Sequence, residues 1–278
     1  MDRLRFGTAG IPICTHLPNT INGIEQVRKL GLENMELEFV HSVHIAENKT
    51  AEVKQAAKKK DVELTCHGQY FINLNSLERA KLEASKQRIY QAAKIASLCG
   101  AKSMTFHAAY YLGQDSEMAY RKVKEGIKEV LQRLNDEGHS IFIRPETTGK
   151  ATQWGTLPEI VRLSQELEKV LPCIDFSHLH ARNGKNNTLA EFREMLNLVE
   201  EKLGREALEN MHIHLSGINY SAKGERNHLI LQESDMNYQD LLRVWKEFKI
   251  KGVVVSESPN IEEDALLLQK FWNMLYVK

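Results

Sequence analysis

The sequence predicts an α/β protein, a single TIM-type (β/α)8 barrel that spans residues 1–278. Two observations carry this prediction. Short apolar runs alternate eight times with longer amphipathic stretches, and no linker, low-complexity segment or break in composition interrupts the series. Strands that alternate with helices of this length form a parallel sheet with the helices outside it. Eight such units are the number that closes a sheet into this barrel.

The first four units show short apolar runs for strands and apolar residues at helical spacing for helices. The expected strands are 4–8, 35–40, 62–67 and 102–107. The expected helices are 20–30, 50–59, 77–98 and 116–134. Gly31 and Gly100 directly follow two of these helices, at a position where glycine commonly ends a helix.

The last four units repeat the pattern. The expected strands are 139–146, 171–175, 211–216 and 252–257, and the expected helices are 156–169, 189–203, 238–248 and 261–276. The stretch LPCIDFSHLH, which begins at Leu171, enters the core as a strand and then supplies potential metal ligands. We expect Asp175 at the end of this strand, with His178 and His180 in the loop beyond it.

An open doubly wound sheet is the alternative fold. Such sheets usually carry a glycine-rich phosphate-binding turn after the first strand. Residues 7–10 read Gly-Thr-Ala-Gly and lack the third glycine of that turn. The barrel is therefore the favoured fold.

The composition is that of a soluble globular protein. Of the 278 residues, 42% are hydrophobic and 27% are charged, and the formal net charge is zero. Zero net charge gives no general attraction to nucleic acid, so a DNA contact would need a local basic surface. The four cysteines are scattered without a CxxC pair, which favours reduced thiols. We find no export signal or membrane span, so the expected location is cytoplasmic.

Six consecutive strands of the expected barrel end in residues that bind metal ions. Strands three to eight bring one each to the carboxyl-terminal rim, where barrel enzymes hold their active sites. These residues are His67, His107, Glu146, Asp175, His214 and Glu257. Each one alone is more often structural than a ligand. Six on one rim indicate a metal site, because closely spaced carboxylates repel one another unless cations lie between them.

The donor types constrain the metal. Histidine with Asp and Glu, and without Cys, suits zinc or manganese at a catalytic site. Six ligands exceed the needs of one catalytic zinc, so we expect two ions that share a bridging carboxylate. His178 and His228 are candidates for a third ion, with His180 and His212 as competing imidazoles. His212 faces the same way as His214 but lies deeper, where a hydrogen-bonded core histidine is expected.

Seven segments between Cys66 and the C-terminus occur in a specific order and spacing. They are CHGQYFINL, TFHAAY, RPETTG, CIDFSHLH, HIHLSG, NHLILQES and SESP. Together they resemble the endonuclease IV family of apurinic/apyrimidinic-site endonucleases. The resemblance implies a zinc-dependent (β/α)8 barrel that cuts DNA 5′ to an abasic site and leaves a 3′-hydroxyl. It also implies that the ions bind the scissile phosphate and activate a water or hydroxide. The expected partner is duplex DNA with abasic sites, and the chain is expected to be a monomer.

Carried over residue by residue, the resemblance implies three metal positions. In order, the ligand sets are His67, His107 and Glu146; Glu146, Asp175, His214 and Glu257; and His178 and His228. Glu146 bridges the first two ions in this scheme. Glu146 and Glu257 are the candidate catalytic residues, and Glu257 is a candidate to orient or deprotonate the nucleophile.

The third position departs from the family pattern. The family motif there is Asp-x-His, but this chain has Arg226, Asn227 and His228. Glu225 is a candidate substitute, although the two-residue period of an extended segment would point its side chain the other way. Arg226 is either a phosphate contact or a solvated loop residue. The third metal site is therefore expected to be weak or absent.

The DNA-binding loops also depart from the family. Tyr70 and Phe71 match some of the loop side chains that the family inserts into the duplex. An aromatic side chain can act as a wedge that fills an unstacked gap. Core packing is the alternative role for both. Residues 40–48 lack a basic-aromatic insertion comparable to the family's. Basic residues in expected rim loops are candidates for phosphate contacts. They are Lys150, Arg182, Lys185, Lys223 and Arg226.

Two other functions remain open at this stage. A sugar isomerase or epimerase on the related xylose-isomerase-like barrel also gathers carboxylates and histidines around two metals. Isomerases usually need a lysine or paired acids for proton or hydride transfer, and fewer histidines, so the histidine-rich set favours the nuclease. A barrel that binds DNA or a sugar phosphate without turnover is the third possibility, and it follows from Arg226 and the short segment at 40–48.

Overall fold

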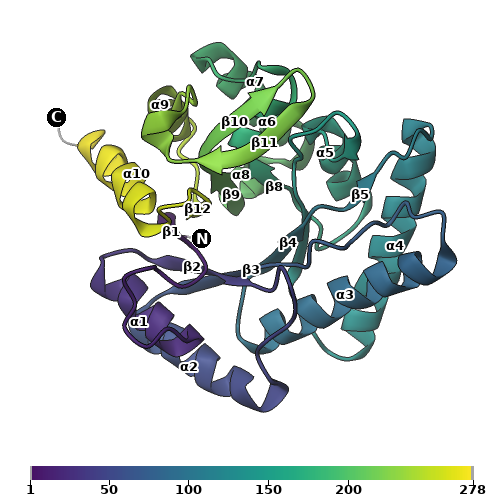
Figure 1. Cartoon of the computed structure of the whole chain (residues 1–278), viewed down its shortest axis with the longest axis horizontal. Helices are drawn as coiled ribbons and strands as arrows, with labels where there is room; N and C mark the ends of the chain where they lie inside the picture. The colour runs from purple at the N-terminus through teal and green to yellow at the C-terminus, as the bar shows by residue number, and fades with distance from the viewer. Residues whose placement is uncertain (1, 277–278) are drawn as a thin grey trace.

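Eight parallel strands form a nearly closed barrel in the computed structural model, which describes residues 2–276 (Figure 1). The strands are β1 (Leu4–Ala9), β2 (Asn34–Glu38), β3 (Glu63–His67), β4 (Ser103–Phe106), β6 (Phe142–Pro145), β8 (Cys173–Asp175), β9 (Met211–Leu215) and β12 (Gly252–Ser256). Their order in the sheet is β6-β4-β3-β2-β1-β12-β9-β8. Parallel bridges from Ile143 to Val170 and from Glu146 to Cys173 link its two ends. The predicted barrel is thus confirmed.

Helices surround this ring of strands (Figure 1). They are α1 (Thr20–Lys29), α2 (Thr50–Lys60), α3 (Arg79–Leu98), α4 (Ser116–Asp136), α5 (Leu157–Glu166), α6 (Phe176–Asn183), α7 (Leu189–Leu203), α8 (Arg205–Leu208), α9 (Tyr238–Glu247) and α10 (Glu262–Met274). Short 3-10 turns occupy η1 (Glu47–Lys49) and η2 (Leu231–Glu233). Two small antiparallel pairs, β5 (Ala109–Tyr110) with β7 (Gln153–Trp154) and β10 (Gly217–Ser221) with β11 (Gly224–Leu229), lie among the loops.

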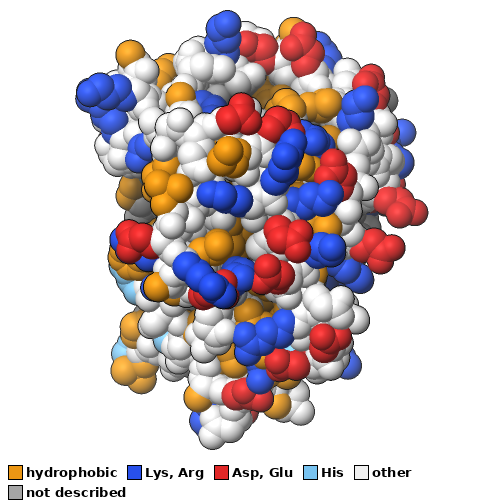
Figure 2. Space-filling model, turned by 90° about the vertical axis from the view of Figure 1, so that its right-hand side faces the viewer, with side chains coloured by type: hydrophobic (Ala, Val, Ile, Leu, Met, Phe, Trp, Pro, Cys, Tyr) orange, Lys and Arg blue, Asp and Glu red, His pale blue; other side chains and the backbone are white. Residues whose placement is uncertain are grey.

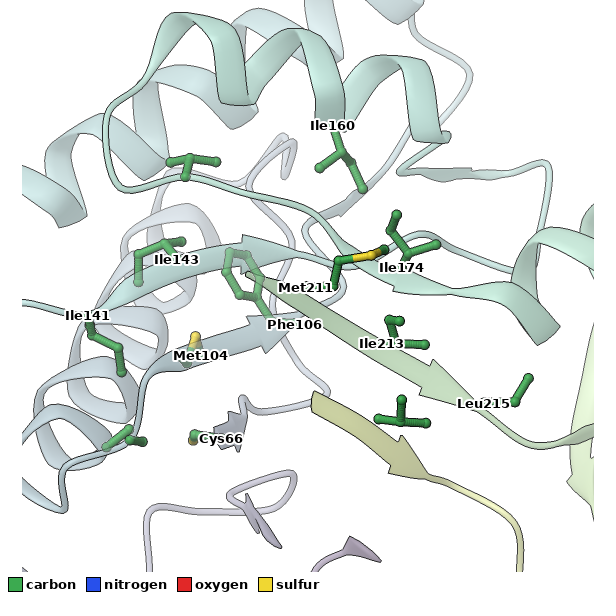
Figure 3. Close-up of a cluster of buried hydrophobic side chains, with 14 of the residues drawn as sticks. Cys66, Met104, Phe106, Ile141, Ile143, Ile160, Ile174, Met211, Ile213 and Leu215 are labelled. Carbon is green, nitrogen blue, oxygen red and sulfur yellow. The ribbon is translucent and has the colours of Figure 1, made fainter. Parts of the chain in front are cut away.

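The alternation of side chains along each strand separates an apolar layer from a polar lumen. In β9, Met211, Ile213 and Leu215 belong to the apolar core between sheet and helices, and Figure 3 shows them in one row. His212 and His214 take the intervening positions and are also buried. Because successive side chains of a strand point to opposite faces, these two histidines face the barrel lumen. The same alternation aims the residues of the neighbouring strands.

Three local expectations are wrong. His178 and His180 lie in helix α6, which follows β8 directly, rather than in a loop. The helix expected at 156–169 ends at Glu166, because Leu167 takes an extended conformation. The segment after β9, expected to be a loop, forms the hairpin β10–β11, which packs against α6.

The surface carries both signs of charge. On the face shown in Figure 2, Lys and Arg side chains are interspersed with Asp and Glu, in keeping with the zero net charge. All four cysteines are free thiols, and three of them are buried. Among residues 2–276, no helix has the length and apolar character needed to cross a membrane.

Candidate metal centre at the barrel mouth

Glu146 lies at the centre of the predicted site. It follows β6 and is fully buried. Its Oε2 atom is 3.3 Å from His67 Nε2 and 3.5 Å from His107 Nε2. Its Oε1 atom is 3.3 Å from His214 Nδ1 and 3.2 Å from His178 Nδ1. The two oxygens therefore face separate pairs of imidazoles, as a carboxylate that bridges two ions would.

The six predicted strand-end residues converge in two groups that share Glu146. In each group the potential ligand atoms lie within 4.8 Å of one another. The groups are His67, His107 and Glu146, and Glu146, Asp175, His214 and Glu257. The parallel register of the strands produces this convergence, because residues at the carboxyl ends of neighbouring strands meet at one rim.

Polar atoms of this cluster are buried without partners. In the described part of the chain, both oxygens of Glu146, Oδ2 of Asp175, Oε2 of Glu257 and Nδ1 of His214 have no hydrogen-bond partner. A buried polar group without a partner costs about 1–3 kcal/mol, and more when it is charged. Divalent cations would remove this cost. Imidazole and carboxylate donors in this number fit zinc or manganese, so the residues present fit a metal cluster.

The protonation of the metal-free cluster follows from its burial and charges. Burial opposes the ionisation of Glu146, but His214 and His107 outweigh it and hold the pKa of Glu146 well below its usual range. Burial would also lower the pKa of His67, yet the Glu146 carboxylate, with Oε2 3.3 Å from His67 Nε2, raises that pKa to about 10. Burial raises the pKa of Asp175 to about 6. Without metal, imidazolium rings supply the positive charge that balances the carboxylates.

Asp175 combines two roles, that of a helix cap and that of a potential metal ligand. It is the N-cap of α6, and its Oδ1 accepts a hydrogen bond from the His178 backbone N–H at 2.6 Å. Its Oδ2 stays free within the cluster. Thr147 fixes the backbone at this point, because its hydroxyl accepts from Asp175 N at 2.8 Å and donates to Asp175 O at 3.1 Å. Helix capping therefore orients the carboxylate and leaves one oxygen for an ion.

The other candidate histidines lie in three different places: at the mouth, apart from it, and in the core. His178 and His228 meet at the mouth, with 3.3 Å between their Nε2 atoms. His180 lies apart, because Nδ1 donates to the Lys185 carbonyl at 2.8 Å and Nε2 lies 3.2 Å from Asp235 Oδ1. His212 is buried beneath His214 and lies 3.0 Å from the Ser103 hydroxyl, which confirms the expected hydrogen-bonded core histidine.

Two glutamates of β2 lie at the site but were not among the residues predicted from the sequence. Glu36 lies 2.9 Å from both His212 Nε2 and His214 Nε2. Glu38 lines the mouth, and burial raises its pKa to about 8. The alternation in the stretch MELE predicts their position. Met35 and Leu37 pack in the apolar core, so both glutamates point to the lumen.

The mouth is a cavity of about 360 Å³. Its lining residues include Glu38, His67, Tyr70, His107, Glu146, His178, Glu225, His228 and Glu257. Most of this lining is imidazole and carboxylate, which suits cations together with an anionic or polyhydroxylated ligand more than an apolar one.

Residues 24–273 match a family model described as xylose isomerase-like TIM barrel. The chain belongs to this family. It is 44% identical over 273 residues to the uncharacterized protein MJ0133 of Methanocaldococcus jannaschii, covering 98% of each chain. It is 24% identical over 209 residues to the probable endonuclease 4 of Bacillus subtilis, covering 73% of this chain and 68% of the relative.

Solved structures of two kinds share the xylose isomerase-like barrel. Endonuclease IV from Thermus thermophilus matches with a TM-score of 0.76 and 18% identity over 98% of each chain. A D-tagatose 3-epimerase-like protein matches with a TM-score of 0.73 and 16% identity, covering 97% of this chain and 96% of that one. Identities this low show a common fold but do not show which reaction this chain catalyses.

The side chains predicted to contact DNA differ in their accessibility. The exposed fractions of Tyr70 and Phe71 are 60% and 71%, so core packing is the wrong alternative for both. Arg226 is exposed as well. Arg182 is not free for a phosphate, because its guanidinium donates to the carbonyls of Thr148, Lys150 and Gln153 and so ties down their loop.

Proposed function

We propose that this chain is a zinc-dependent DNA repair endonuclease that cleaves duplex DNA 5′ to abasic sites. The observation that carries the proposal is the position of Glu146 between two groups of imidazoles. The imidazoles of His67 and His107 lie on one side of Glu146. They are donors beyond those that a site for a single ion needs. The distant similarity to endonuclease 4 proteins supports the same reaction class. We further propose that the chain acts in the cytoplasm as a monomer.

The chain's own residues would hold the ions and the phosphodiester. His67, His107 and Glu146 would hold one ion, and Glu146, Asp175, His214 and Glu257 the second. When bound, divalent ions neutralise charge on phosphate oxygens and lower the pKa of a nearby water. Glu257 Oε2 has no hydrogen-bond partner among the described residues, and the side chain lines the cavity. We assign it to orient the attacking water and accept its proton.

The rim residues would recognise the lesion. Tyr70, in the loop after β3, lines the cavity that the phosphate would enter, and Phe71, the next residue, is exposed. An abasic site lacks a base, so the duplex holds a gap there that an aromatic side chain can fill at little unstacking cost. Arg226 is positioned on the exposed side of the hairpin, where a guanidinium can contact a phosphate.

The experiment uses a duplex that contains one tetrahydrofuran abasic analogue and a matched undamaged duplex. With zinc or manganese, the chain should nick the first duplex once, 5′ to the analogue, and leave a 3′-hydroxyl that a polymerase can extend. The undamaged duplex should stay intact. Failure to cut the lesion duplex with either metal would overturn the proposal.

A sugar epimerase is the second candidate, favoured by one specific observation. Glu146, Asp175, His214 and Glu257 by themselves form a complete site for one ion, and Glu38 adds a buried carboxyl to the cavity. Paired acids beside a metal suit proton transfer at a carbon next to a carbonyl. Incubation of the same preparation with manganese and ketohexoses, followed by chromatography of the sugars, tests this. Epimerisation without DNA cleavage would favour the epimerase.

A further inference from the structure

Helix α6 leaves the barrel sheet directly at the candidate metal centre. Asp175 is the last residue of β8 and Phe176 is the first residue of α6, so the helix follows the strand without a loop. Strands β6 and β9 lie on either side of β8 at this junction. A helix turns its backbone groups along its own axis, so α6 does not continue the parallel ladders to β6 and β9.

On the β6 side, the hydroxyl of Thr147 takes the place of a ladder partner. The Thr147 N–H donates to the Cys173 carbonyl at 3.1 Å, as in a parallel sheet. The next bond of a regular ladder would join the Asp175 N–H to the Thr147 carbonyl. Instead, the Asp175 N–H donates to the Thr147 hydroxyl at 2.8 Å, and this hydroxyl donates to the Asp175 carbonyl at 3.1 Å. The Thr147 carbonyl is thereby left for His178, whose Nδ1 atom lies 3.0 Å away.

On the β9 side, the hydroxyl of Ser177 has the same double function. It donates to the Ser216 carbonyl at 2.7 Å and accepts from the Ser216 backbone N–H at 3.0 Å. Ser216 is the residue after β9, and Ser177 is the second residue of α6. Thr147, Ser177 and Ser216 are all fully buried. On each side of the junction, one side-chain hydroxyl therefore bonds both backbone groups of its partner, and we call each of these pairs of bonds a hydroxyl clamp.

The two hydroxyl clamps connect residues proposed to hold the same ion. Thr147 directly follows Glu146, and its hydroxyl holds the backbone of Asp175. Ser177 comes two residues after Asp175 and holds the residue that comes two positions after His214. The clamps therefore fix the backbones of three neighbouring ligands relative to one another. The ligands of this ion, here called the Asp175 group, are Glu146, Asp175, His214 and Glu257.

We propose that Thr147 and Ser177 are positioning residues of the metal centre, whose hydroxyls determine how tightly the Asp175 group holds its ion. The inference rests on the metal centre of the proposed function, and it concerns the binding of the ion rather than the reaction. Ligands that are already held in place lose less freedom when an ion binds, so their affinity is higher. The clamps hold β6, β8 and β9, whereas His67 and His107 extend from β3 and β4. The ion beside these two histidines should therefore be less affected.

The test measures zinc affinities of the chelator-treated, full-length chain by competition with a chromophoric chelator. Thr147→Val keeps the shape of the side chain and removes its hydroxyl. It should lower one zinc affinity about 10–100-fold, as the loss of other outer partners of metal ligands does. Ser177→Ala should lower the same affinity. Thr147→Ser, which retains a hydroxyl, should bind zinc as tightly as the unaltered chain.

The matched control is Ser85→Ala. Ser85 is a buried serine of α3 whose hydroxyl also donates to one backbone carbonyl, that of Lys81 at 2.7 Å, and accepts from one backbone N–H, that of Asn73 at 3.0 Å. This variant loses the same kind of bonds but should keep every zinc affinity. If Thr147→Val and Ser177→Ala bind zinc as tightly as Ser85→Ala does, the inference is overturned. Should Thr147→Val fail to fold by circular dichroism, Ser177→Ala decides between these outcomes.

A second readout separates a positioning role from a merely structural one. Cobalt(II) in place of zinc absorbs visible light with an intensity that depends on the arrangement of its ligands. At saturating cobalt, Thr147→Val and Ser177→Ala should alter this spectrum, while Thr147→Ser and Ser85→Ala should reproduce that of the unaltered chain. An unchanged spectrum in both clamp variants would contradict the positioning role. None of these measurements involves DNA, so a chain that shows these effects but fails to cut the lesion duplex contradicts the proposed function and leaves this inference supported.

Discussion

The Glu36 carboxylate lies next to the candidate metal centre, with its Oε1 atom 2.9 Å from His214 Nε2. Both side chains are fully buried, and the second oxygen of Glu36 is 2.9 Å from His212 Nε2. Burial opposes ionisation of Glu36, but His214 and His212 hold its pKa below its usual range. The negative charge of an ionised Glu36, at this distance, favours a hydrogen on the Nε2 atom of His214. The Nδ1 atom, 3.3 Å from oxygens of Glu146 and Glu257, is then left free for an ion.

Glu36→Gln should therefore weaken metal binding without removing a ligand. A glutamine offers one oxygen to two imidazoles and turns an N–H toward the other, so His214 loses its fixed tautomer. We expect zinc affinity of the Glu146 group to fall about 10–100-fold, as for other outer partners of metal-bound histidines. Competition with a chromophoric chelator measures this.

The matched control is Glu52→Gln, an exposed glutamate of α2 that pairs with Lys49. It should keep the zinc affinity of the unaltered chain. Equal affinities for Glu36→Gln and the control would show that Glu36 does not position His214.

In the proposed two-ion arrangement, Glu146→Gln should remove the carboxylate that both ions would share. We expect zinc content to fall and the nicking rate on the lesion duplex to drop by about 10²–10³-fold or more, comparable to the loss of a strong electrostatic group in other active sites. Nicking kinetics and metal analysis check this. Glu166→Gln on the outer helix α5, where the carboxylate pairs with Lys124 and Arg162, is the control. A Glu146 variant with normal zinc content would contradict the bridging role.

The barrel and its strand ends were predictable because both depend on periodicity. A strand such as β9 shows its two faces in the sequence MHIHL, and its register with β8 and β12 follows from the parallel sheet. The convergence around Glu146 is a direct consequence of that register. Donors from six separate strands could thus be assigned to one rim before any coordinates.

Helix α6 and the β-bulge of the hairpin β10–β11, where Arg226 is the extra residue, were not predictable by the same means. The residues from Phe176 to Ala181 are all buried, so this stretch of α6 has no solvent-exposed face and lacks the pattern that predicts a surface helix. The bulge at Arg226 breaks the alternation that predicts strand faces, so Glu225 was expected to point away from the site. In both cases the tertiary contacts, rather than the local pattern, set the direction of a side chain.

The metal-free chain should lose stability as the pH rises from about 6.5 to about 10. His67 has an ordinary pKa of 6.5 and a folded pKa of about 10, raised against burial by Glu146. A raised pKa of this kind contributes stability fully below 6.5, and that contribution is lost as the pH rises through the folded value. His178 and His214 also have raised pKa values and act in the same direction.

Zinc should remove most of this dependence, because an ion takes the place of the proton on each ligand nitrogen. Thermal melts with chelator and with zinc, at several values between pH 6.5 and 10, measure the difference. The midpoint with chelator should fall steadily, and the midpoint with zinc should change less. A chelator midpoint that stays level or rises across this range would contradict the protonation scheme of the cluster.

Tyr70→Ala should weaken binding to the lesion duplex and leave the fold unchanged. The Tyr70 side chain is 60% exposed on the rim, so little core packing is lost on truncation. Stacking of an aromatic side chain against a base contributes about 1–3 kcal/mol, so we expect affinity to fall by roughly 5–150-fold. Fluorescence anisotropy with a catalytically inactive Glu146→Gln background measures binding without cleavage.

Tyr276→Ala is the matched control, because Tyr276 has the same exposed fraction of 60%. It lines a depression with Leu4 and Lys251, at the end of the barrel where β1 and β12 begin, and so lies away from the mouth. Its truncation should leave the affinity for both duplexes unchanged. If Tyr70→Ala binds the tetrahydrofuran duplex as tightly as Tyr276→Ala does, the wedge assignment fails, and lesion recognition must come from other residues of the rim.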